Sequence, residues 1–478
     1  MSKLIRALAA ATVLLAGAAP VQAQPAAKPD PTQPAFRALY KELVETNTTA
    51  SVGSCTQAAE RMAAHLKAAG FPDSDLTLFT APGFPKDGGL VAVLPGKDPK
   101  AKAILMLAHL DVVEAKREDW TRDPFTLVEE GGYFYGRGSS DDKAQAAIWV
   151  DSLVRYKTEG FKPKRTIKMA LTCGEESGGR LNGASWLVQN KRDLIDAEFA
   201  LNEGAGGQLD DHGKRIAHTI EAGEKTSQSF TLEVTNPGGH SSRPVPDNAI
   251  YRLADALEKI RGYEFPVMLN DANRGYLTQM AKVVGGEQGA AMTAIVANPA
   301  DARADAILSK DPGLHTMLRT TCVATMLSAG HAQNALPQRA TANINCRIFP
   351  GVARETVREK LIDLINDSQV AVSRVSIVRA EGEAPSAAPP LTPKVLGPIE
   401  KLTAEMWPGV PVVPILQAGA TDGKPLTAGG IPTYGVSGLF FEPDLGRIHG
   451  LNERIGVQSL YEGREFLYRL VKLYADAP

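Results

Sequence analysis

The sequence is poor in cysteine and has almost no net charge. Its 478 residues include 4 Cys and no Cys-x-x-Cys pair, which excludes a disulfide-built mini-protein and argues against a cysteine-held metal site. Lys and Arg number 52 against 54 Asp and Glu, a formal charge of -2. This balance argues against a nucleic-acid binder or a polybasic membrane-surface protein. Small neutral or zwitterionic molecules are the expected partners.

Long apolar runs are also missing, except at the N-terminus. Lys3 and Arg6 precede an apolar run over 7–19, and Val21-Gln22-Ala23 ends in a small-x-small pattern. These features are typical of a secretory signal peptide over residues 1–23, with an uncleaved anchor as the alternative. No later run reaches the roughly 18 apolar residues that a spanning helix needs. We therefore expect export to a periplasm or the extracellular space, without membrane insertion after cleavage.

The marker sequences of several enzyme classes are absent. There is no G-x-x-x-x-G-K-[ST] phosphate loop, no G-x-S-x-G elbow and no H-E-x-x-H helix. Gly136-Arg137-Gly138 lacks the third glycine of a dinucleotide fingerprint. The sequence therefore lacks the usual evidence for a P-loop nucleotidase, a serine esterase or a helix-borne zinc protease.

Hydrophobic periodicity is present and predicts an α/β layer. The chain is 44% hydrophobic and 22% charged, which is ordinary for a packed core. A flexible lead-in over 24–34 precedes the first helix. Apolar spacing predicts helices and buried strands in alternation: helices over 36–45, 56–69 and 142–158, and strands over 89–94, 103–107, 166–172 and 197–201.

The pattern then changes to strict alternation, which predicts a second domain. Its order of elements is that of a ferredoxin-like α+β unit, a four-stranded sheet with two helices on one face. The elements are strands over 227–235, 320–327, 339–348 and 370–378 and helices over 248–261 and 353–367. A helix-rich insertion over 262–315 interrupts this unit, and a Pro- and Ala-rich linker over 385–393 follows it. A helix over 396–406 and a strand over 434–436 return to the first domain.

Domain boundaries follow from these patterns. We expect a first domain over 35–222 and 385–478, and a second domain over 223–384 inserted into it. Cys322 and Cys346 lie in two neighbouring predicted strands and could pair in an oxidising compartment, or remain two buried apolar thiols.

Acids and imidazoles occur where predicted strands end. His109 and Asp111 follow one strand and lie on the same side of an extended chain. They could act as a metal ligand and the carboxylate that orients it, or they could simply be the polar end of a strand. Asp141 and Asp142 lie in a glycine-bracketed turn that opens a helix, where a helix N-cap is the alternative.

The adjacent glutamates Glu175 and Glu176 are the strongest signal. They follow a buried strand in a glycine-rich loop, and a cation would relieve their repulsion and use one as ligand and the other as general base. Glu203 follows the next strand, and His449 lies in a late glycine-rich loop. Two imidazoles and several carboxylates suit two divalent ions such as Zn²⁺, so the residues predict a metal-dependent hydrolase.

These motifs together resemble the M20 family of metallopeptidases, in order and over essentially the whole mature chain. The matching strings are Ala108-His109-Leu110-Asp111-Val112-Val113, Gly136-Arg137-Gly138-Ser139-Ser140-Asp141-Asp142-Lys143, Gly174-Glu175-Glu176-Ser177-Gly178-Gly179, Asn202-Glu203-Gly204 and His449. The long inserted domain and the signal peptide are similar to the carboxypeptidase S-like and aminoacylase-like branch. The resemblance implies a zinc-peptidase-type catalytic domain, with a mixed sheet covered by helices, and a lid domain used for dimerisation.

The resemblance also implies roles for individual residues. The metal ligands it implies for two Zn²⁺ per chain are His109, Asp141, Glu176, Glu203 and His449. Asp141 would bridge both ions, and its peptide bond to Asp142 would be cis. Glu175 matches the general base, and Asp111 matches the acid that orients His109. Glu203 stands where dipeptidase-like members often have Asp, which favours the carboxypeptidase and aminoacylase side.

Further matches concern substrate binding. His240 resembles a histidine that reaches the active site of a partner subunit and stabilises the oxyanion, although a local turn histidine is the alternative. Asn334 and Arg347 resemble the pair that holds the substrate carboxylate, whereas strand alternation also allows Arg347 to extend into solvent. Thr421 lies in a string similar to a substrate loop. Many members have Arg where Lys424 stands, so the role of Lys424 stays open.

The sequence thus predicts an exported dinuclear zinc hydrolase, a homodimer through its lid domain. It would cleave a peptide or amide bond next to a free carboxylate, by attack of a metal-held hydroxide with Glu175 as base. An N-acyl-amino-acid deacylase is the alternative with the same site. The remaining alternative is a secreted binding protein that has the same fold but no catalytic activity.

Overall fold

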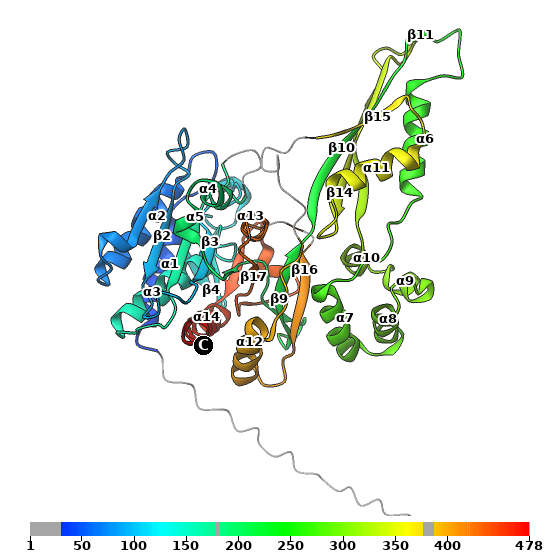
Figure 1. The fold of residues 1–478 in the computed structure, drawn as a ribbon. Coiled ribbons are helices and arrows are strands. Elements are labelled where there is room, and N and C mark those ends of the chain that lie inside the picture. The colour runs from blue at the N-terminus through cyan, green and yellow to red at the C-terminus, as the bar shows by residue number, and fades with distance from the viewer. Residues whose placement is uncertain (1–29, 177–180, 376–386, 418, 420, 478) are drawn as a thin grey trace, which may run out of the picture.

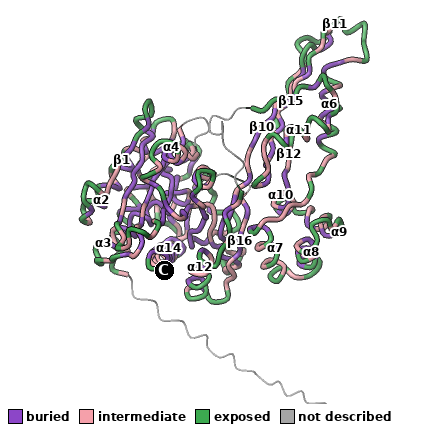
Figure 2. The backbone as a smooth tube through the Cα atoms, in the orientation of Figure 1, coloured by how far each residue is buried: buried purple, intermediate pink, exposed green. Residues whose placement is uncertain are grey.

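The computed structural model describes residues 30–176, 181–375, 387–417, 419 and 421–477. The predicted signal peptide over 1–23 lies outside the described residues, as does most of the lead-in over 24–34. Figure 1 shows a helix-covered body and an elongated arm that extends away from it. Buried residues concentrate in the body, whereas along the arm they alternate with exposed and half-buried residues (Figure 2).

The body is built on a mixed sheet of ten strands. The strands, in their order across the sheet, are β1 (Leu76–Phe79), β2 (Gly89–Leu94), β6 (Ile167–Thr172), β3 (Ile104–His109), β7 (Phe199–Asn202), β17 (Thr433–Gly435), β9 (Arg215–Glu224), β8 (Gly207–Leu209) and β18 (Phe440–Phe441), with β16 (Val412–Gln417) paired to β9. The central strands β6, β3, β7 and β17 run parallel, and β1, β2 and β9 add antiparallel pairs.

Helices cover both faces of this sheet, as the apolar strand sequences predict. Along β3, Ile104 and Met106 pack on one face and Leu105 and Leu107 on the other. The helices on the first face are α1 (Gln33–Glu45), α2 (Cys55–Ala68), α3 (Lys143–Thr158), α12 (Pro393–Met406) and α14 (Val457–Asp476); those on the second are α4 (Gly183–Asn190), α5 (Arg192–Ile195) and α13 (Gly423–Ala428). The predicted mixed sheet covered by helices is confirmed.

The arm is a four-stranded antiparallel sheet with two helices on one face. Its strands, in order, are β12 (Thr321–Ala329), β14 (Arg339–Ile348), β10 (Thr226–Thr235) and β15 (Val370–Arg374), and its helices are α6 (Ala249–Arg261) and α11 (Arg354–Ile365). Alternate residues of β10, Phe230, Leu232 and Val234, are fully buried under the helices. A two-stranded ribbon, β11 (Gly239–His240) with β13 (Ala335–Leu336), forms the far tip.

The predicted insertion over 262–315 is a compact cluster of four helices, α7 (Asp271–Val284), α8 (Gly286–Ala297), α9 (Ala302–Leu308) and α10 (Pro312–Leu318). It does not extend the arm; α7 packs against β16 of the body (Figure 1). A Cβ atom on Gly275 would lie 2.9 Å from Cγ of Pro414, so a glycine permits this close approach.

The junction between arm and body is fixed by a buried lysine. Lys225 separates β9 from β10, and its backbone N–H donates to the Gln417 carbonyl at 2.9 Å. Its ammonium donates to the backbone carbonyls of Thr316 at 2.8 Å and Arg319 at 2.7 Å, at the end of the helical insertion.

The remaining elements are a small sheet of β4 (Val128–Glu130), β5 (Tyr133–Tyr135) and β19 (Arg454–Gly456), and the 3-10 turns η1 (Asp73–Asp75), η2 (Arg117–Asp119) and η3 (Leu445–Arg447).

Two predictions at the level of local structure need correction. The end of the lead-in is ordered, because α1 begins at Gln33 and the Asp30 carboxylate pairs with the buried Arg464 at 2.8 Å. The alternative of two buried thiols is wrong, since Cys322 and Cys346 form a disulfide between β12 and β14. A second disulfide, which was not predicted, joins Cys55 to Cys173.

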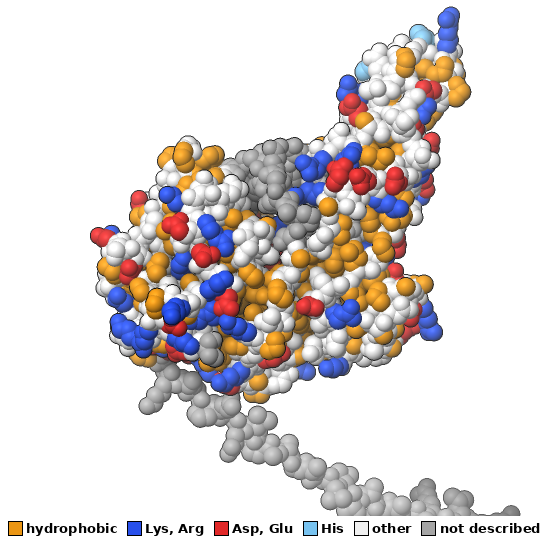
Figure 3. All heavy atoms as spheres, viewed as in Figure 1, with side chains coloured by type: hydrophobic (Ala, Val, Ile, Leu, Met, Phe, Trp, Pro, Cys, Tyr) orange, Lys and Arg blue, Asp and Glu red, His pale blue; other side chains and the backbone are white. Residues whose placement is uncertain are grey.

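Two surface properties bear on partners. Lys and Arg are intermixed with Asp and Glu over the face shown in Figure 3. Among the described residues, no helix combines the length and the apolar character needed to cross a membrane.

Candidate active site

Three neighbouring strands carry the site at their carboxyl ends. β6, β3 and β7 are adjacent and parallel, so their carboxyl ends meet at one edge of the sheet. His109 is the last residue of β3, Glu175 and Glu176 follow β6, and Glu203 follows β7. The crevice outside the carboxyl ends of such strands is the common location of ligand sites in α/β sheets.

Asp141 lies between two imidazoles. Its Oδ1 is 3.0 Å from Nε2 of His109, and its Oδ2 is 3.1 Å from Nε2 of His449. The same His449 nitrogen is 2.6 Å from Oε1 of Glu176. Each oxygen of one carboxylate thus faces a different imidazole, the arrangement that a carboxylate shared by two cations requires. The peptide bond between Asp141 and Asp142 is cis, as the resemblance implied.

The turn that carries Asp141 is held by a glutamate that the sequence analysis did not single out. Glu453 is fully buried, and its Oε1 accepts from the backbone N–H groups of Ser140 at 2.8 Å and Asp141 at 3.2 Å. Its Oε2 accepts from the Gly138 N–H at 3.0 Å and the Arg137 guanidinium at 2.7 Å. One buried carboxylate therefore accepts from four donors of this turn.

Asp111 supports the glutamate loop as well as His109. Nδ1 of His109 is 3.0 Å from the backbone carbonyl of Asp111 and 3.7 Å from its carboxylate, so the carbonyl makes the hydrogen bond. The Asp111 carboxylate instead accepts from the backbone N–H groups of Glu175 at 3.3 Å and Glu176 at 3.0 Å.

Carboxyl groups are crowded together around this cluster. Burial, together with the nearby Asp422, Glu176 and Asp111 carboxylates, raises the pKa of Glu175 to about 8. Burial and the neighbouring Asp141 raise the pKa of Glu203 well above its ordinary range. Hydrogen bonds to Asp141 and Glu176 raise the pKa of His449 to about 10. The repulsion among these carboxylates is of the kind that a bound cation relieves.

The cluster opens into a cavity of about 590 Å³, large enough for a small substrate. Its wall includes Asp141, Glu175, Glu176, Glu203 and His449, so the site residues from four separate chain segments share one space.

Thr421 also lines this cavity, and two acids outside the predicted set, Glu224 and Asp422, hold its loop. Its N–H and hydroxyl donate to the Glu224 carboxylate at 2.8 and 2.6 Å. The neighbouring Asp422 accepts from the Thr172 hydroxyl at 2.6 Å and from the Asn182 amide at 2.5 Å, which ties the Thr421 loop to the end of β6. Lys424 lies near Glu224, where its positive charge lowers the pKa of that carboxyl, whereas burial raises it more.

The remaining predicted residues lie outside the cavity wall. His240 and the adjacent Asn334 belong to the ribbon at the far tip of the arm, away from the body of the same chain (Figure 1). Arg347 pairs with Ser227 and Thr321 near the base of the arm, close to the junction lysine Lys225. Their predicted substrate contacts stay predictions.

The donor set fits divalent metal ions. One nitrogen or oxygen atom from each of His109, Asp141 and Glu176 lies within 4.8 Å of the others, and His449 and Glu203 adjoin them. Imidazole and carboxylate are the ligands that catalytic zinc sites use, and a bound cation offsets the repulsion among clustered carboxylates.

Clustered carboxylates and imidazoles that line a cavity at the edge of a mixed α/β sheet define a metallopeptidase-type hydrolase. The chain belongs to peptidase family M20/M25/M40, whose model matches residues 105–473.

Relatives and solved structures agree with this assignment. Human N-fatty-acyl-amino acid synthase/hydrolase PM20D1 is 29% identical over 391 residues, 79% of this chain and 75% of that protein. Probable carboxypeptidase S-like 2 of Dictyostelium discoideum is 29% identical over 389 residues, 79% and 72% of the two chains. Rat aminoacylase-1B is 25% identical over 403 residues, 82% and 85%.

Two solved structures share the fold. The M20 family metallo-carboxypeptidase Sso-CP2 of Sulfolobus solfataricus has a TM-score of 0.65 and 18% identity, covering 92% of this chain and 99% of that one. The YXEP protein of Bacillus subtilis, described as a dinuclear metal binding peptidase from the M20 family, has a TM-score of 0.59 and 12% identity, covering 92% and 98%.

Proposed function

We propose that this M20 hydrolase cleaves a peptide or amide bond next to a free carboxylate, in a site that holds two Zn²⁺ ions. The observation that carries the proposal is the Asp141 carboxylate, each of whose oxygens faces a different imidazole. His109, Glu203, Glu176 and His449 would complete the two ligand sets. Bound zinc would polarise the scissile carbonyl and increase the acidity of water.

The chain itself supplies the proton transfers. Glu175 lines the cavity beside the ligands, and we assign it as the base that takes a proton from the attacking water at its carboxylate and then passes it to the leaving nitrogen. Asp111 holds the Glu175 backbone in place. Thr421 also lines the cavity, and its hydroxyl donates to the Glu224 carboxylate.

Recognition of the substrate carboxylate is assigned to Arg347 and Asn334, and stabilisation of the oxyanion to His240 of a second subunit. Position supports the second assignment, because the tip of the arm lies away from the cavity of its own chain.

The arm also offers a dimer surface. β12 is an edge strand, and the side chains of Val323, Met326 and Leu327 on it are 60%, 72% and 64% exposed.

N-acyl amino acids are a second candidate substrate class, favoured by the apolar part of the cavity wall. Ile415, Leu439, Phe441, Leu445 and Ile448 line the same cavity as the acidic cluster. An acyl chain could lie against these side chains while its amide faces the carboxylates. The PM20D1 and aminoacylase relatives carry names that describe such substrates.

A substrate panel with a metal chelator tests these proposals. We expect hydrolysis of dipeptides, of N-acetyl and N-long-chain-acyl amino acids, or of both, with loss of activity in chelator and recovery on Zn²⁺ addition. Purified protein should contain up to two zinc ions per chain, and His449→Ala should lower occupancy at one site. Activity that survives complete metal removal would contradict the proposal, and an inert protein that still binds ligand would indicate a binding function.

The trans role of His240 has its own test. If dimers of His240→Ala and Glu175→Gln chains are mixed, one of the two sites in a mixed dimer regains both residues, so activity should reappear. Absence of recovery in demonstrably mixed dimers would remove the trans assignment.

Export to a periplasm or the extracellular space remains part of the proposal. The N-terminal pattern over 1–23 supports it, and so does the pairing of all four cysteines, because structural disulfides persist mainly in oxidising compartments.

A further inference from the structure

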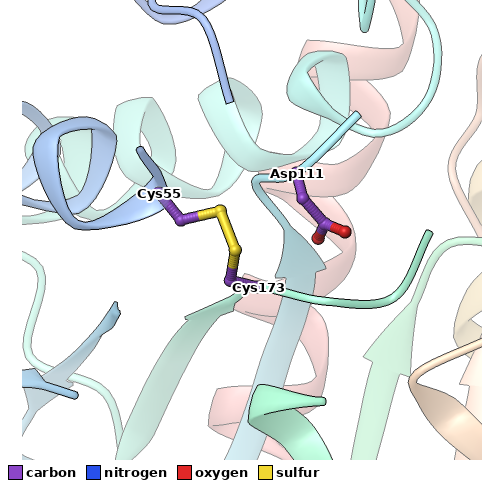
Figure 4. Close-up of side chains that lie close together, drawn as sticks. All are labelled: Cys55, Asp111 and Cys173. Carbon is purple, nitrogen blue, oxygen red and sulfur yellow. A yellow bond between two sulfur atoms is a disulfide. The ribbon is translucent and has the colours of Figure 1, made fainter. Parts of the chain in front are cut away.

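The Cys55–Cys173 disulfide lies directly beside the glutamate loop. Cys55 is the first residue of α2 and Cys173 follows the last residue of β6, so the bond joins segments 118 residues apart in the sequence. Both cysteines are buried. Figure 4 shows the bond between the start of α2 and the end of β6, with the Asp111 side chain close to it. A sulfur of each cysteine and an Asp111 carboxylate oxygen lie within 4.8 Å of one another.

The short segment from Cys173 to Glu176 is held at both ends. At its start, the disulfide fixes Cys173, and the Cys173 carbonyl accepts from the Gly183 N–H at 2.7 Å. Gly174 then turns the chain with a φ of +87°, where an added Cβ would lie 1.8 Å from the Leu181 carbonyl oxygen. At its end, the Asp111 carboxylate accepts from the N–H groups of Glu175 and Glu176.

The position of the disulfide therefore bears on two functional side chains. Glu175 and Glu176 follow Cys173 by two and three residues, and Glu176 reaches His449 at 2.6 Å. Ligand and base must be held within about 0.5 Å of their working positions. Once the bond opens, each sulfur needs van der Waals room in a buried space shared with Asp111, so both anchors of the glutamate segment are disturbed together.

We infer that the Cys55–Cys173 disulfide positions Glu175 and Glu176, so that its reduction lowers metal affinity and turnover together. The inference rests on the proposed function for the roles of these glutamates. A phosphine reductant supplies the two electrons: the S–S bond breaks, each sulfur takes one proton from water, and the phosphine takes the oxygen and becomes its oxide. Oxidised glutathione reverses the change, with two glutathione thiols released as the S–S bond forms again.

The chain contains a matched control. The Cys322–Cys346 disulfide joins β12 to β14 within the arm, and neither cysteine belongs to the cavity wall around the carboxylate cluster. A purely stabilising disulfide would affect unfolding in either place, but only the one beside Asp111 should affect metal binding.

The first experiment compares two double variants, C55A/C173A and C322A/C346A. Zn²⁺ affinity is measured by competition with a chelating dye, and kcat and KM are measured on the best substrate of the panel. We expect C55A/C173A to bind Zn²⁺ about tenfold or more weakly and to lose at least as much in kcat, since partners that orient metal ligands typically contribute ten- to hundredfold. KM should change less than kcat, because the rest of the cavity wall does not depend on this disulfide. C322A/C346A should stay within about twofold of the parent in Zn²⁺ affinity and in kcat.

The second experiment avoids any failure of C55A/C173A to fold. The C322A/C346A protein keeps only the Cys55–Cys173 bond, and it is reduced with a phosphine in its folded state and then reoxidised with oxidised glutathione. Zn²⁺ affinity and kcat should fall when two thiols appear and return when they disappear. Unchanged Zn²⁺ affinity with two free thiols present would overturn the inference. A parent protein that binds Zn²⁺ but hydrolyses none of the substrates would instead count against the proposed function, while the affinity measurement still tests the disulfide.

Discussion

Glu453→Gln is a one-atom change that should weaken both the fold and the metal site. Glu453 is fully buried, and its two oxygens accept four hydrogen bonds, from Arg137 and from the backbone N–H groups of Gly138, Ser140 and Asp141. A carboxamide keeps one accepting oxygen and replaces the other with an NH₂ group. Whichever way the amide turns, two of the four donors then face another donor.

The magnitude follows from these contacts. Two hydrogen bonds with a charged acceptor are lost, each worth about 1.5 to 3 kcal/mol. Arg137, only 2% exposed, is left without its counter-charge. Breaking a buried ion pair on one side costs about 3 to 5 kcal/mol, and we expect Glu453→Gln to lower the free energy of unfolding by that amount. The remaining amide oxygen should stay with the charged Arg137 guanidinium, so the N–H groups of Ser140 and Asp141 lose their acceptor and Zn²⁺ affinity should fall by about ten- to hundredfold.

Urea unfolding and dye competition for Zn²⁺ measure the two effects. Glu442→Gln is the matched control, since Glu442 is a half-buried carboxylate whose Oε1 accepts a hydrogen bond from the Tyr133 hydroxyl at 2.7 Å. It should change stability by less than about 1 kcal/mol and leave metal affinity unaltered. Loss of stability in Glu453→Gln with normal Zn²⁺ affinity would show that the turn bearing Asp141 does not depend on Glu453 for its position.

Four further outcomes are expected. Glu175→Gln should keep metal and lose about a hundredfold or more in kcat, whereas Glu176→Gln should weaken metal binding itself; near-normal kcat in the first would refute the base assignment. Arg347→Ala should lose the preference for a free-acid substrate over its C-terminal amide, while equal discrimination by both proteins would place carboxylate recognition elsewhere. Met326→Lys on the exposed edge strand should shift the protein toward monomer in sedimentation or light scattering; an unchanged dimer would exclude this edge as the interface. Burial lowers the pKa of His218 to about 3, below its ordinary value of 6.5. The contribution of His218 to the free energy of unfolding should therefore be full above about pH 6.5 and fall by up to about 1.4 kcal/mol per pH unit as pH decreases toward 3. His218→Gln should flatten this slope in urea titrations, and an identical slope would mean that His218 is already protonated in the fold.

The elements and the central cluster could be predicted because both depend on local patterns. Apolar runs locate strands such as β3 and β6, and parallel strand order brings their carboxyl ends together, so polar residues after each strand must converge. This places His109 beside Glu175 and Glu176 without any knowledge of distances. The expected helix over 142–158 begins one residue later, because Asp142 is still part of the preceding turn.

The supporting residues could not be predicted in the same way. Glu453 and Asp422 are single acids in loops, and nothing in their spacing distinguishes them from exposed acids; only the fold shows that they are buried among donors. The Cys55–Cys173 pair is separated by 118 residues, and sequence alone does not fix connectivity. The docking of α7 on β16 depends on the fit of Gly275 to Pro414, a property of two surfaces rather than of either sequence.

The helical insertion has a mechanical consequence for the arm. Its chain enters from α6 and leaves into β12, so both of its ends belong to the arm, while its first helix rests on a strand of the body. Rotation of the arm about Lys225 would have to separate α7 from β16 and also break the bonds from the Lys225 ammonium to Thr316 and Arg319. The arm is therefore attached to the body at two places, the Lys225 junction and the contact of α7 with β16. The segment that restricts its rotation carries none of the predicted catalytic residues.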